Sequence, residues 1–413
     1  MSLIKPFAGL RPAPGRATEV VAPPYDVMSA AEARAMVEGR PWSFLHISRA
    51  EVDLPADTDP YDAAVYDQAR ANLAAMLEAG VLVRDPSPRY YVYRLTLGGH
   101  RQTGLVVTAS VEAYRTHRIQ RHELTRPVKE DDRVRQIEAL NAQTGPVFLV
   151  HPDVPAIDRA IEEASRGAPE VVTKAGDGVD HELWSVTDPD AIARLTAAFE
   201  ALPALYIADG HHRCAAAARV SAARRGHAVS ASTGASADYF LAVTFPAAEV
   251  QILAYNRVIR DLNGLEPNAF LDRLAAAFRV ARSADPVVPA GHGEFGLYLD
   301  GRWYRLTIDP AAIPREDPVG RLDVSLLQER LIGPILGITD PRRDERIDFV
   351  GGVRGLDGLT ERVDSGEMRL ALTLYPTAIE DLIAVAEAGA LMPPKSTWFE
   401  PKLADGLVSH VLD

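Results

Sequence analysis

The sequence contains almost no cysteine: Cys214 is the single one among 413 residues. One thiol excludes an intrachain disulfide, and it excludes a metal cluster held by several cysteines. Because disulfides belong to oxidising compartments, the lone cysteine favours a reducing one, and we expect a cytoplasmic protein. The ordinary interpretation of Cys214 itself is a small apolar residue packed on a helix.

Positive charge is also in deficit, since 44 Lys and Arg face 57 Asp and Glu and leave a formal net charge of −13. This balance repels polyanions and argues against nucleic acid as a partner, because duplex binding depends on clustered positive charge. No apolar run approaches the ~20 residues of a membrane span, and the proline-rich start develops no signal-peptide core. We expect neither nucleic-acid nor membrane binding, and the sequence leaves the oligomeric state open.

The usual nucleotide and hydrolase motifs are missing. There is no Walker lysine loop, no Gly-x-Gly-x-x-Gly run after a strand and no Gly-x-Ser-x-Gly elbow. The composition, 47% hydrophobic and 24% charged, is nevertheless that of an ordinary globular protein of two or three domains. A conventional nucleotide-binding fold is therefore not supported.

Hydrophobic periodicity predicts hairpins and segregated helices, and this mixture favours an α+β fold over a doubly wound sheet. The clearest helix spans Tyr61–Glu78, and Gly98-Gly99 predicts a hairpin turn between two strands. We also expect strands over Val20–Val27 and Phe44–Ile47, and a mobile loop over Ser230–Ala237. We place an N-terminal α+β portion at residues 1–245 and a C-terminal portion, packed on it, at 246–413.

The strongest motif is Asp209-Gly210-His211-His212-Arg213, which follows a short predicted strand and opens an Ala-rich helix. Asp209 stands where an N-cap belongs, and Gly210 lets a ligand approach the backbone. Cations at the positive end of a helix are unfavourable unless an anion lies there. The motif therefore predicts a phosphate site in which Arg213 binds bidentately. A capped surface helix with incidental histidines is the alternative, and zinc fits less well because adjacent histidines diverge on a helix.

A second candidate group lies between a predicted strand and a helix, and comprises His122, Glu123, Thr125, Lys129 and Arg133. Glu123 could act as a general base or bind magnesium. Lys129 and Arg133 are four residues apart, so they share one helix face and could add positive charge at a phosphate. An ordinary solvated face with salt bridges explains these residues equally well.

Two further segments combine double prolines with reactive side chains. The first carries Tyr25 and Asp26, which a stiff turn could aim into a site. The second carries Lys395, Ser396 and Thr397, a combination that suits phosphate binding. A structural turn and a C-terminal packing loop are the respective alternatives.

Five separated segments in this order resemble domain-of-unknown-function family 1015, over residues 5 to about 402. They are Lys5-Pro6-Phe7, Ala22–Val27, His122-Glu123 with Thr125, Ala208–Arg213 and Met392–Phe399. The resemblance implies a mixed-sheet core of the ParB/sulfiredoxin-like type, with additional helices and a C-terminal α/β portion. The string Asp209–Arg213 is also similar to the phosphate-binding motif of that superfamily, which includes free-serine kinases. This similarity implies phosphorylation of free L-serine to O-phosphoserine with pyrophosphate, or a nucleotide, as donor.

The resemblance also implies roles for the candidate residues. Glu123, and second Asp209, would serve as base and as ligands of Mg²⁺. By the resemblance, the phosphate site comprises Gly210, His212 and Arg213, with His211 as a catalytic residue. From the chemistry of the other segments, we assign phosphate binding also to Lys129, Arg133, Lys395, Ser396 and Thr397, and substrate binding to Tyr25, Asp26, His122 and Thr125.

One departure concerns the small residues Cys214–Ala217 after the motif, which put the substrate fit in doubt. Two alternative functions stay open. One is hydrolysis of phosphoserine, and the other is a non-catalytic nucleotide-binding regulatory protein, against which the negative charge and the missing helix-turn-helix signal count.

Overall fold

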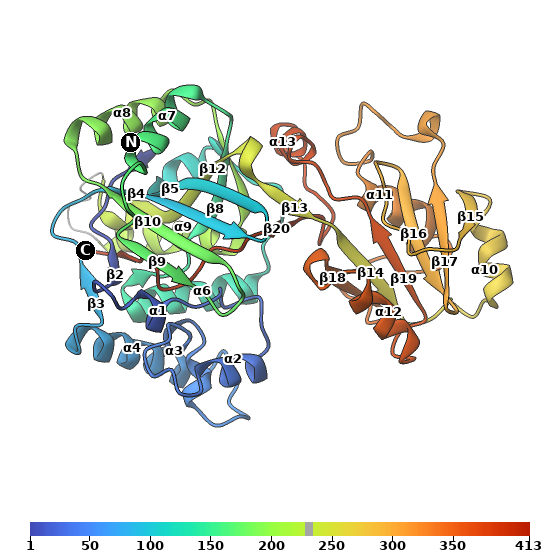
Figure 1. The fold of residues 1–413 in the computed structure, drawn as a ribbon, viewed down its shortest axis with the longest axis horizontal. Helices are drawn as coiled ribbons and strands as arrows, with labels where there is room; N and C mark the ends of the chain where they lie inside the picture. Colours follow the sequence, from blue (N-terminus) through green and yellow to red (C-terminus); the bar gives the residue numbers. More distant parts are fainter. Residues whose placement is uncertain (228–233) are drawn as a thin grey trace. The chain divides into compact units, whose positions relative to one another are not determined.

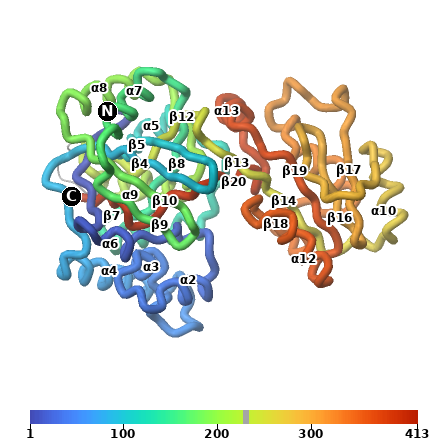
Figure 2. The backbone as a smooth tube through the Cα atoms, viewed as in Figure 1, coloured from blue at the N-terminus to red at the C-terminus, as the bar shows by residue number. Residues whose placement is uncertain are grey.

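The computed structural model describes residues 1–227 and 234–413, which divide into two compact units. The first unit comprises Met1–Val250 together with Pro401–Asp413, and the second comprises Gln251–Glu400 (Figure 1). The predicted C-terminal portion, residues 246–413, therefore differs from the second unit, because the last residues of the chain, Pro401–Asp413, belong to the first unit. In Figure 2, the C-terminal end of the chain lies among the N-terminal elements of the first unit.

A mixed sheet forms the centre of the first unit, with the order β6-β11-β8-β12-β5-β4-β10-β9, and β1 pairs with β5. β12 runs parallel to β8 and β11 runs parallel to β6, whereas the other pairs are antiparallel. The bounds are β1 Ile4–Lys5, β4 Tyr90–Leu97, β5 His100–Ser110, β6 Ile119–Gln120, β8 Val147–His151, β9 Val171–Lys174, β10 Asp180–Val186, β11 Leu205–Asp209 and β12 Tyr239–Pro246. The predicted α+β class is confirmed.

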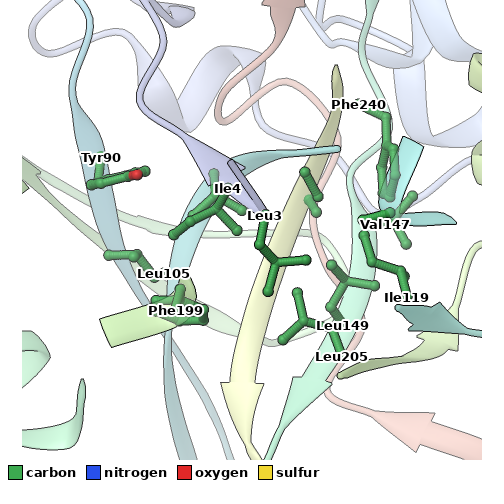
Figure 3. Packing of buried hydrophobic residues seen from close by; sticks show 14 of the residues in the cluster. Leu3, Ile4, Tyr90, Leu105, Ile119, Val147, Leu149, Phe199, Leu205 and Phe240 are labelled. Atoms are coloured by element: carbon green, nitrogen blue, oxygen red, sulfur yellow. The ribbon is translucent and has the colours of Figure 1, made fainter. Parts of the chain in front are cut away.

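The hairpin predicted at Gly98-Gly99 joins β4 to β5, and Gly98 has the positive φ of 58° that such a turn requires. One face of the sheet packs against α7 (Pro155–Ala164) and α8 (Pro189–Glu200), which bury Ile157 and Phe199. Figure 3 shows Phe199 next to Leu105, and Tyr90 belongs to the same cluster. Each buried aromatic or aliphatic side chain of this kind contributes ~1.5–3 kcal/mol.

The remaining helices of the first unit carry much of the candidate site. α9 (His211–His227) packs against α6 (Pro127–Leu140), and α6 packs against α4 (Ala63–Glu78). The prediction of a helix over Tyr61–Glu78 is therefore confirmed to within two residues at its start. The other elements are α1 Ala17–Val20, α2 Ala30–Val37, α3 Leu45–Ser48, α5 Val111–Arg115, β2 Leu10–Pro12, β3 Leu82–Arg84, β7 Ala142–Gln143 and β21 His410–Val411.

Two predicted strands are wrong. In the segment Val20–Val27, Val20 is the last residue of the short helix α1, and the rest pairs only through an isolated bridge from Ala22 to Asp405. Phe44–Ile47 lies at helix α3 and not in a strand. Val20–Pro24 in the first run and Phe44, Leu45 and Ile47 in the second are apolar and buried, and burial alone does not distinguish a short strand from a helical turn. The loop predicted over Ser230–Ala237 falls partly outside the described residues, and its end forms the 3-10 turn η2 (Ser236–Asp238).

The second unit has its own antiparallel sheet, in the order β15-β17-β16-β19-β14-β18, and a separate pair of β13 with β20. A π-helix, η5 (Gln328–Ile332), continues α11 (Asp323–Leu327). The other bounds are β13 Gln251–Leu253, β14 Tyr255–Ile259, α10 Pro267–Leu274, β15 Arg279–Ser283, β16 Glu294–Leu299, β17 Arg302–Thr307, β18 Ile347–Gly351, α12 Asp357–Asp364, β19 Leu370–Leu374, α13 Ile379–Glu387 and β20 Trp398–Glu400. Among the described residues, no helix combines the length and the apolar character needed to cross a membrane.

Candidate functional site

The junction of β11 and α9 has the geometry of a site that only glycine can form. Gly210 has a φ of 97°, and a Cβ there would lie 3.3 Å from Cα of Val147. Its carbonyl accepts the first helical hydrogen bonds, from the amides of Arg213 and Cys214. Gly210 therefore occupies the N-cap position, one residue later than predicted, and Oδ1 of Asp209 accepts a hydrogen bond from the Gly210 amide at 2.8 Å.

Asp209 is held by a lysine that sequence reasoning missed. Nζ of Lys402 donates to Oδ2 of Asp209 at 3.3 Å. Burial raises the pKa of Asp209, but the charges of Lys402 and Arg213 outweigh that effect, so the pKa lies well below its ordinary value. A carboxylate that stays ionised is a weak base, which makes Asp209 a poor second choice as general base.

His211 is buried and neutral. Burial is the main reason that its pKa lies well below the ordinary value, and the neighbouring His122 lowers it further. Its Nε2 accepts a hydrogen bond from the His122 amide at 3.4 Å, so the ring proton belongs on Nδ1. Nδ1 in turn faces Oε2 of Glu123 at 3.9 Å. His122 also packs edge-on against His211, with ring centroids 4.5 Å apart, and burial lowers its pKa to about 4.

His212 also binds the segment that precedes α6. Its Nε2 accepts from the Arg126 amide at 3.0 Å, and burial together with the Arg126 charge lowers its pKa. The two histidines therefore act as acceptors that fix the backbone of residues 122–126. The structure thus brings the first two predicted groups together, with Glu123 placed beside the motif.

Arg213 turns inward, with a side chain that is 11% exposed. Nη1 donates to the Pro146 carbonyl at 2.5 Å and Nη2 donates to Oδ2 of Asp26 at 3.1 Å. Two guanidinium groups lie over the ring of Tyr25, with the central carbon 5.6 Å from the ring centroid for Arg213 and 4.0 Å for Arg133. The third predicted segment thus joins the site as well.

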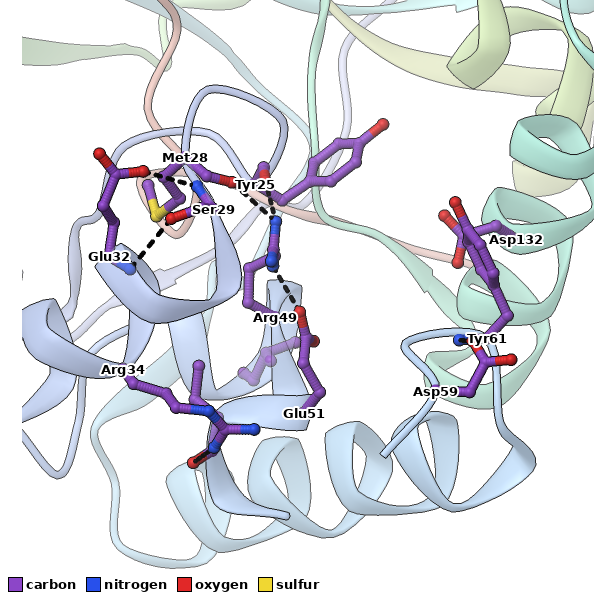
Figure 4. Close-up of polar contacts among 12 residues, drawn as sticks. Tyr25, Met28, Ser29, Glu32, Arg34, Arg49, Glu51, Asp59, Tyr61 and Asp132 are labelled. Atoms are coloured by element: carbon purple, nitrogen blue, oxygen red, sulfur yellow. Dashed lines mark hydrogen bonds and ion pairs between the residues drawn. The ribbon is translucent and has the colours of Figure 1, made fainter. Parts of the chain in front are cut away.

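The turn that carries Tyr25 is fixed by Arg49, as Figure 4 shows. Nη1 of Arg49 donates to the Tyr25 carbonyl at 2.9 Å and to the Met28 carbonyl at 3.1 Å. Its Nε pairs with Glu51 at 2.6 Å, so the guanidinium is oriented from both sides. Arg49 is therefore a structural residue that positions Tyr25 and Asp26.

A cavity of about 30 Å³ lies beside Arg213, with room for one or two waters. Its polar lining is formed by Tyr25, Ser48, Arg133, Gln136, Gln143, Thr144, Arg213 and Asp405. Asp405 is 2% exposed and, like Lys402, comes from the returning C-terminal segment. Burial raises its pKa to about 7 even though Arg213 opposes the shift. No local motif marks Asp405 in the sequence, so pattern reasoning could not have found it.

Some predicted residues point elsewhere. The Thr125 hydroxyl donates to Glu130, and the Lys129 ammonium lies over the Tyr61 ring at 5.4 Å. The Lys395–Thr397 segment belongs to the second unit, where the Ser396 hydroxyl donates to the Pro393 carbonyl at 2.6 Å. In the first unit, therefore, Thr125 and Lys129 do not line the cavity.

The donor set does not fit a resident magnesium ion. Within the described part of the chain, no three His, Cys, Asp or Glu side chains are grouped to hold a metal. Both oxygens of Asp209 already accept protein hydrogen bonds, and Glu123 approaches His211. Magnesium binding by Glu123 and Asp209 therefore stays a prediction. Mg²⁺ usually binds one or two carboxylates together with substrate phosphates, so such an ion would arrive with a polyphosphate.

Comparisons with known proteins give a family. The search of curated proteins returned no match. Similar solved structures include a free serine kinase in complex with AMP (12% identity, 71% of this chain and 86% of that one, TM-score 0.35). Others are a conserved hypothetical protein from Pyrococcus furiosus (14%, 73% and 93%, 0.36) and SbnI with a C-terminal truncation from Staphylococcus aureus (10%, 73% and 85%, 0.37). The model of the protein of unknown function family DUF1015 matches residues 4–325, and the chain belongs to that family.

Proposed function

We propose that this protein is a small-molecule phosphotransferase that converts free L-serine to O-phosphoserine, with pyrophosphate or a nucleotide as phosphoryl donor. The observation that carries the proposal is the inward-turned Arg213 in the first turn of α9, beside a cavity that Arg133 also lines. Helix N-termini with a guanidinium are suited to phosphate, because free amides and a fixed positive charge converge there.

Asp26 holds the position that a phosphate would take. Its side chain is 40% exposed, and its carboxylate pairs with Nη2 of Arg213. An exposed carboxylate gains little from such a pair, so a doubly charged phosphate competes well for the same donor. Lys402 supplies further positive charge at Asp209. Phosphate binding would then release Asp26 toward solvent.

Glu123 is the base in this proposal. Its side chain is 45% exposed, so a substrate can reach it, and its Oε2 faces Nδ1 of the neutral His211. Glu123 takes the proton from the serine hydroxyl while the serine oxygen bonds to the terminal phosphorus. The bond from that phosphorus to the bridging oxygen breaks, so pyrophosphate yields O-phosphoserine and orthophosphate. Magnesium, bound to the donor, would neutralise charge on the transferred group.

The choice of serine rests on the motif resemblance, and the assay must test it directly. Purified full-length protein is incubated with L-serine, Mg²⁺ and pyrophosphate, ATP or ADP in separate arms, and O-phosphoserine is quantified. A further arm contains O-phosphoserine alone. We expect O-phosphoserine to form with pyrophosphate or a nucleotide, and only when serine is present.

The same arms separate the alternatives. Orthophosphate released from O-phosphoserine without any product in the serine arms would replace the kinase by a hydrolase. Nucleotide binding with no turnover in any arm, together with a gel shift of duplex DNA at low salt, would instead indicate a regulatory protein. Glycerol and L-threonine as acceptors test whether the hydroxyl or the amino-acid part is recognised.

A further inference from the structure

Arg257 is a buried arginine in the second unit that has no acidic partner. It lies in β14, opposite Phe349 of β18 and Leu372 of β19, and is 4% exposed. Nη1 donates to the Tyr255 carbonyl and Nη2 to the Lys395 carbonyl, the latter at 2.9 Å. No carboxylate from the described residues forms an ion pair with it, and only Tyr255 acts on it electrostatically.

A buried charge balanced only by carbonyl dipoles is costly. Transfer of an ion out of water costs several kcal/mol, and carbonyl hydrogen bonds recover only part of that. Burial accordingly lowers the pKa of Arg257 to about 10. Proteins keep such a group where a bound anion supplies the missing charge, as local rules are broken mainly at functional sites.

Arg257 lines a cavity that is large enough for a small organic molecule. Its open volume is about 340 Å³, within the range of ligand pockets. The lining is mainly apolar: Val324, Ile332, Ile347, Phe349, Pro341, Pro393 and Pro394. Its charged side chains are Arg257, Arg342 and Asp340, a net charge of 2 − 1 = +1, and Asp340 already pairs with Arg342 at 2.9 Å. The uncompensated charge is therefore that of Arg257.

Two neighbouring elements give this cavity its form. The π-helix η5 contributes Gln328 and Ile332 to the wall, and π-helical turns are frequent at functional sites. The carbonyl of Lys395, which follows the double proline, holds the guanidinium from the other side. The Phe349 ring lies 5.2 Å from the guanidinium carbon and offers a face on which a planar group can stack.

We propose that this cavity binds a small organic anion, a carboxylate or phosphate attached to a planar apolar body, with Arg257 as the charge that recognises it. The site lies within the second unit and is independent of the phosphotransfer proposed for the first. In this interpretation the Pro393–Lys395 segment anchors the recognition arginine of a separate ligand site.

The test is a fluorescence titration of the full chain with 8-anilinonaphthalene-1-sulfonate, an aromatic anion, in the native protein and four variants. Arg257→Gln removes the charge, and Thr339→Trp fills the cavity from an exposed wall position. We expect each to weaken binding at least tenfold. Arg330→Gln, on the same π-helix but outside the lining, and Arg213→Ala, in the first unit, should bind the probe like the native chain.

Competition then identifies the anion. Benzoate displacing the probe indicates a carboxylate ligand, phenyl phosphate displacing it indicates a phosphate ligand, and either result supports the site. Benzamide competing as well as benzoate would show that charge is not recognised and would overturn the proposal, as would native-like binding by Arg257→Gln. If circular dichroism shows that Arg257→Gln does not fold, Thr339→Trp decides, and undiminished binding by that variant rejects the site.

Discussion

Nη2 of Arg213 donates to Oδ2 of Asp26 at 3.1 Å and thereby joins two residues that are 187 positions apart. Asp26 follows the double-proline turn, and Arg213 lies in the first turn of α9. The pair is asymmetric, since Arg213 is 11% exposed and Asp26 is 40% exposed. The arginine is therefore a fixed part of the site, whereas the carboxylate is the partner that a phosphate would replace.

Replacement of Arg213 by Ala should abolish phosphotransfer and leave the fold intact. Loss of a preorganised cation at a transferred phosphoryl group costs about 10²–10³ in kcat, while Asp26 remains solvated. The measurement is turnover in the serine assay, with the far-ultraviolet circular dichroism of the variant beside it. Arg219→Ala, on the same helix and 46% exposed, is the control that should keep full activity. Unchanged turnover in folded Arg213→Ala would remove the phosphate assignment.

Glu123→Gln should slow the chemical step and spare donor binding. The amide has nearly the same shape as the carboxylate but cannot take the serine proton, so kcat should fall by about 10²–10⁴. Pyrophosphate affinity, measured by calorimetry, should stay within a few-fold of the native value. Glu138→Gln on the exposed side of α6 serves as the matched control. Equal losses of kcat and affinity would assign Glu123 to binding.

Gly210→Ala should destabilise the first unit and impair the site. The residue has a φ of 97°, and the added Cβ would lie 3.3 Å from Cα of Val147. Such strain costs about 1–3 kcal/mol, which urea denaturation can measure. Gly226→Ala in the same helix meets nothing within 4 Å and should stabilise by about 0.5–1 kcal/mol. Equal effects of the two substitutions would contradict the strained backbone.

Asp405→Asn should make the protein more stable above neutral pH. The folded carboxyl keeps its proton up to about pH 7, whereas the unfolded one releases it near 3.8. The folded state thus binds more protons in this window, so native stability falls as the pH rises from about 4 to 7. The neutral amide removes that fall. Urea denaturation at pH 5 and pH 8 tests this, with the exposed Asp67→Asn as control.

Acid should unfold the protein partly through its buried histidines. The folded His151 has a pKa of about 3, lowered by burial, against an ordinary value of 6.5. The unfolded chain binds this proton first, so stability falls as the pH drops from about 6.5 toward 3. His151→Asn should remove about 1.4 kcal/mol per pH unit from that slope. His181→Asn, with a folded pKa of about 4, should act similarly, and an unchanged slope in both would refute the account.

Local sequence patterns predicted the elements of this protein that depend on a few adjacent residues: a helix, a hairpin turn and a junction of strand and helix. The periodicity of residues 61–78 predicts α4, and Gly98-Gly99 predicts the hairpin of β4 and β5. The motif at 209–213 identifies the junction of a strand and a helix, because a glycine with positive φ and an N-terminal turn are properties of a few adjacent residues. The family, too, follows from such short motifs.

Only the tertiary structure decided which distant residues meet. The apolar run that begins at Phe44 forms a helix and not a strand. Residues 401–413 belong to the first unit, where Lys402 pairs with Asp209 and Asp405 lies beside Arg213. The tertiary structure also assigned Lys395 to the second unit, where its carbonyl holds Arg257. Backbone conformation is set by neighbouring residues, whereas long-range contacts depend on sheet pairing and burial, which no local pattern encodes.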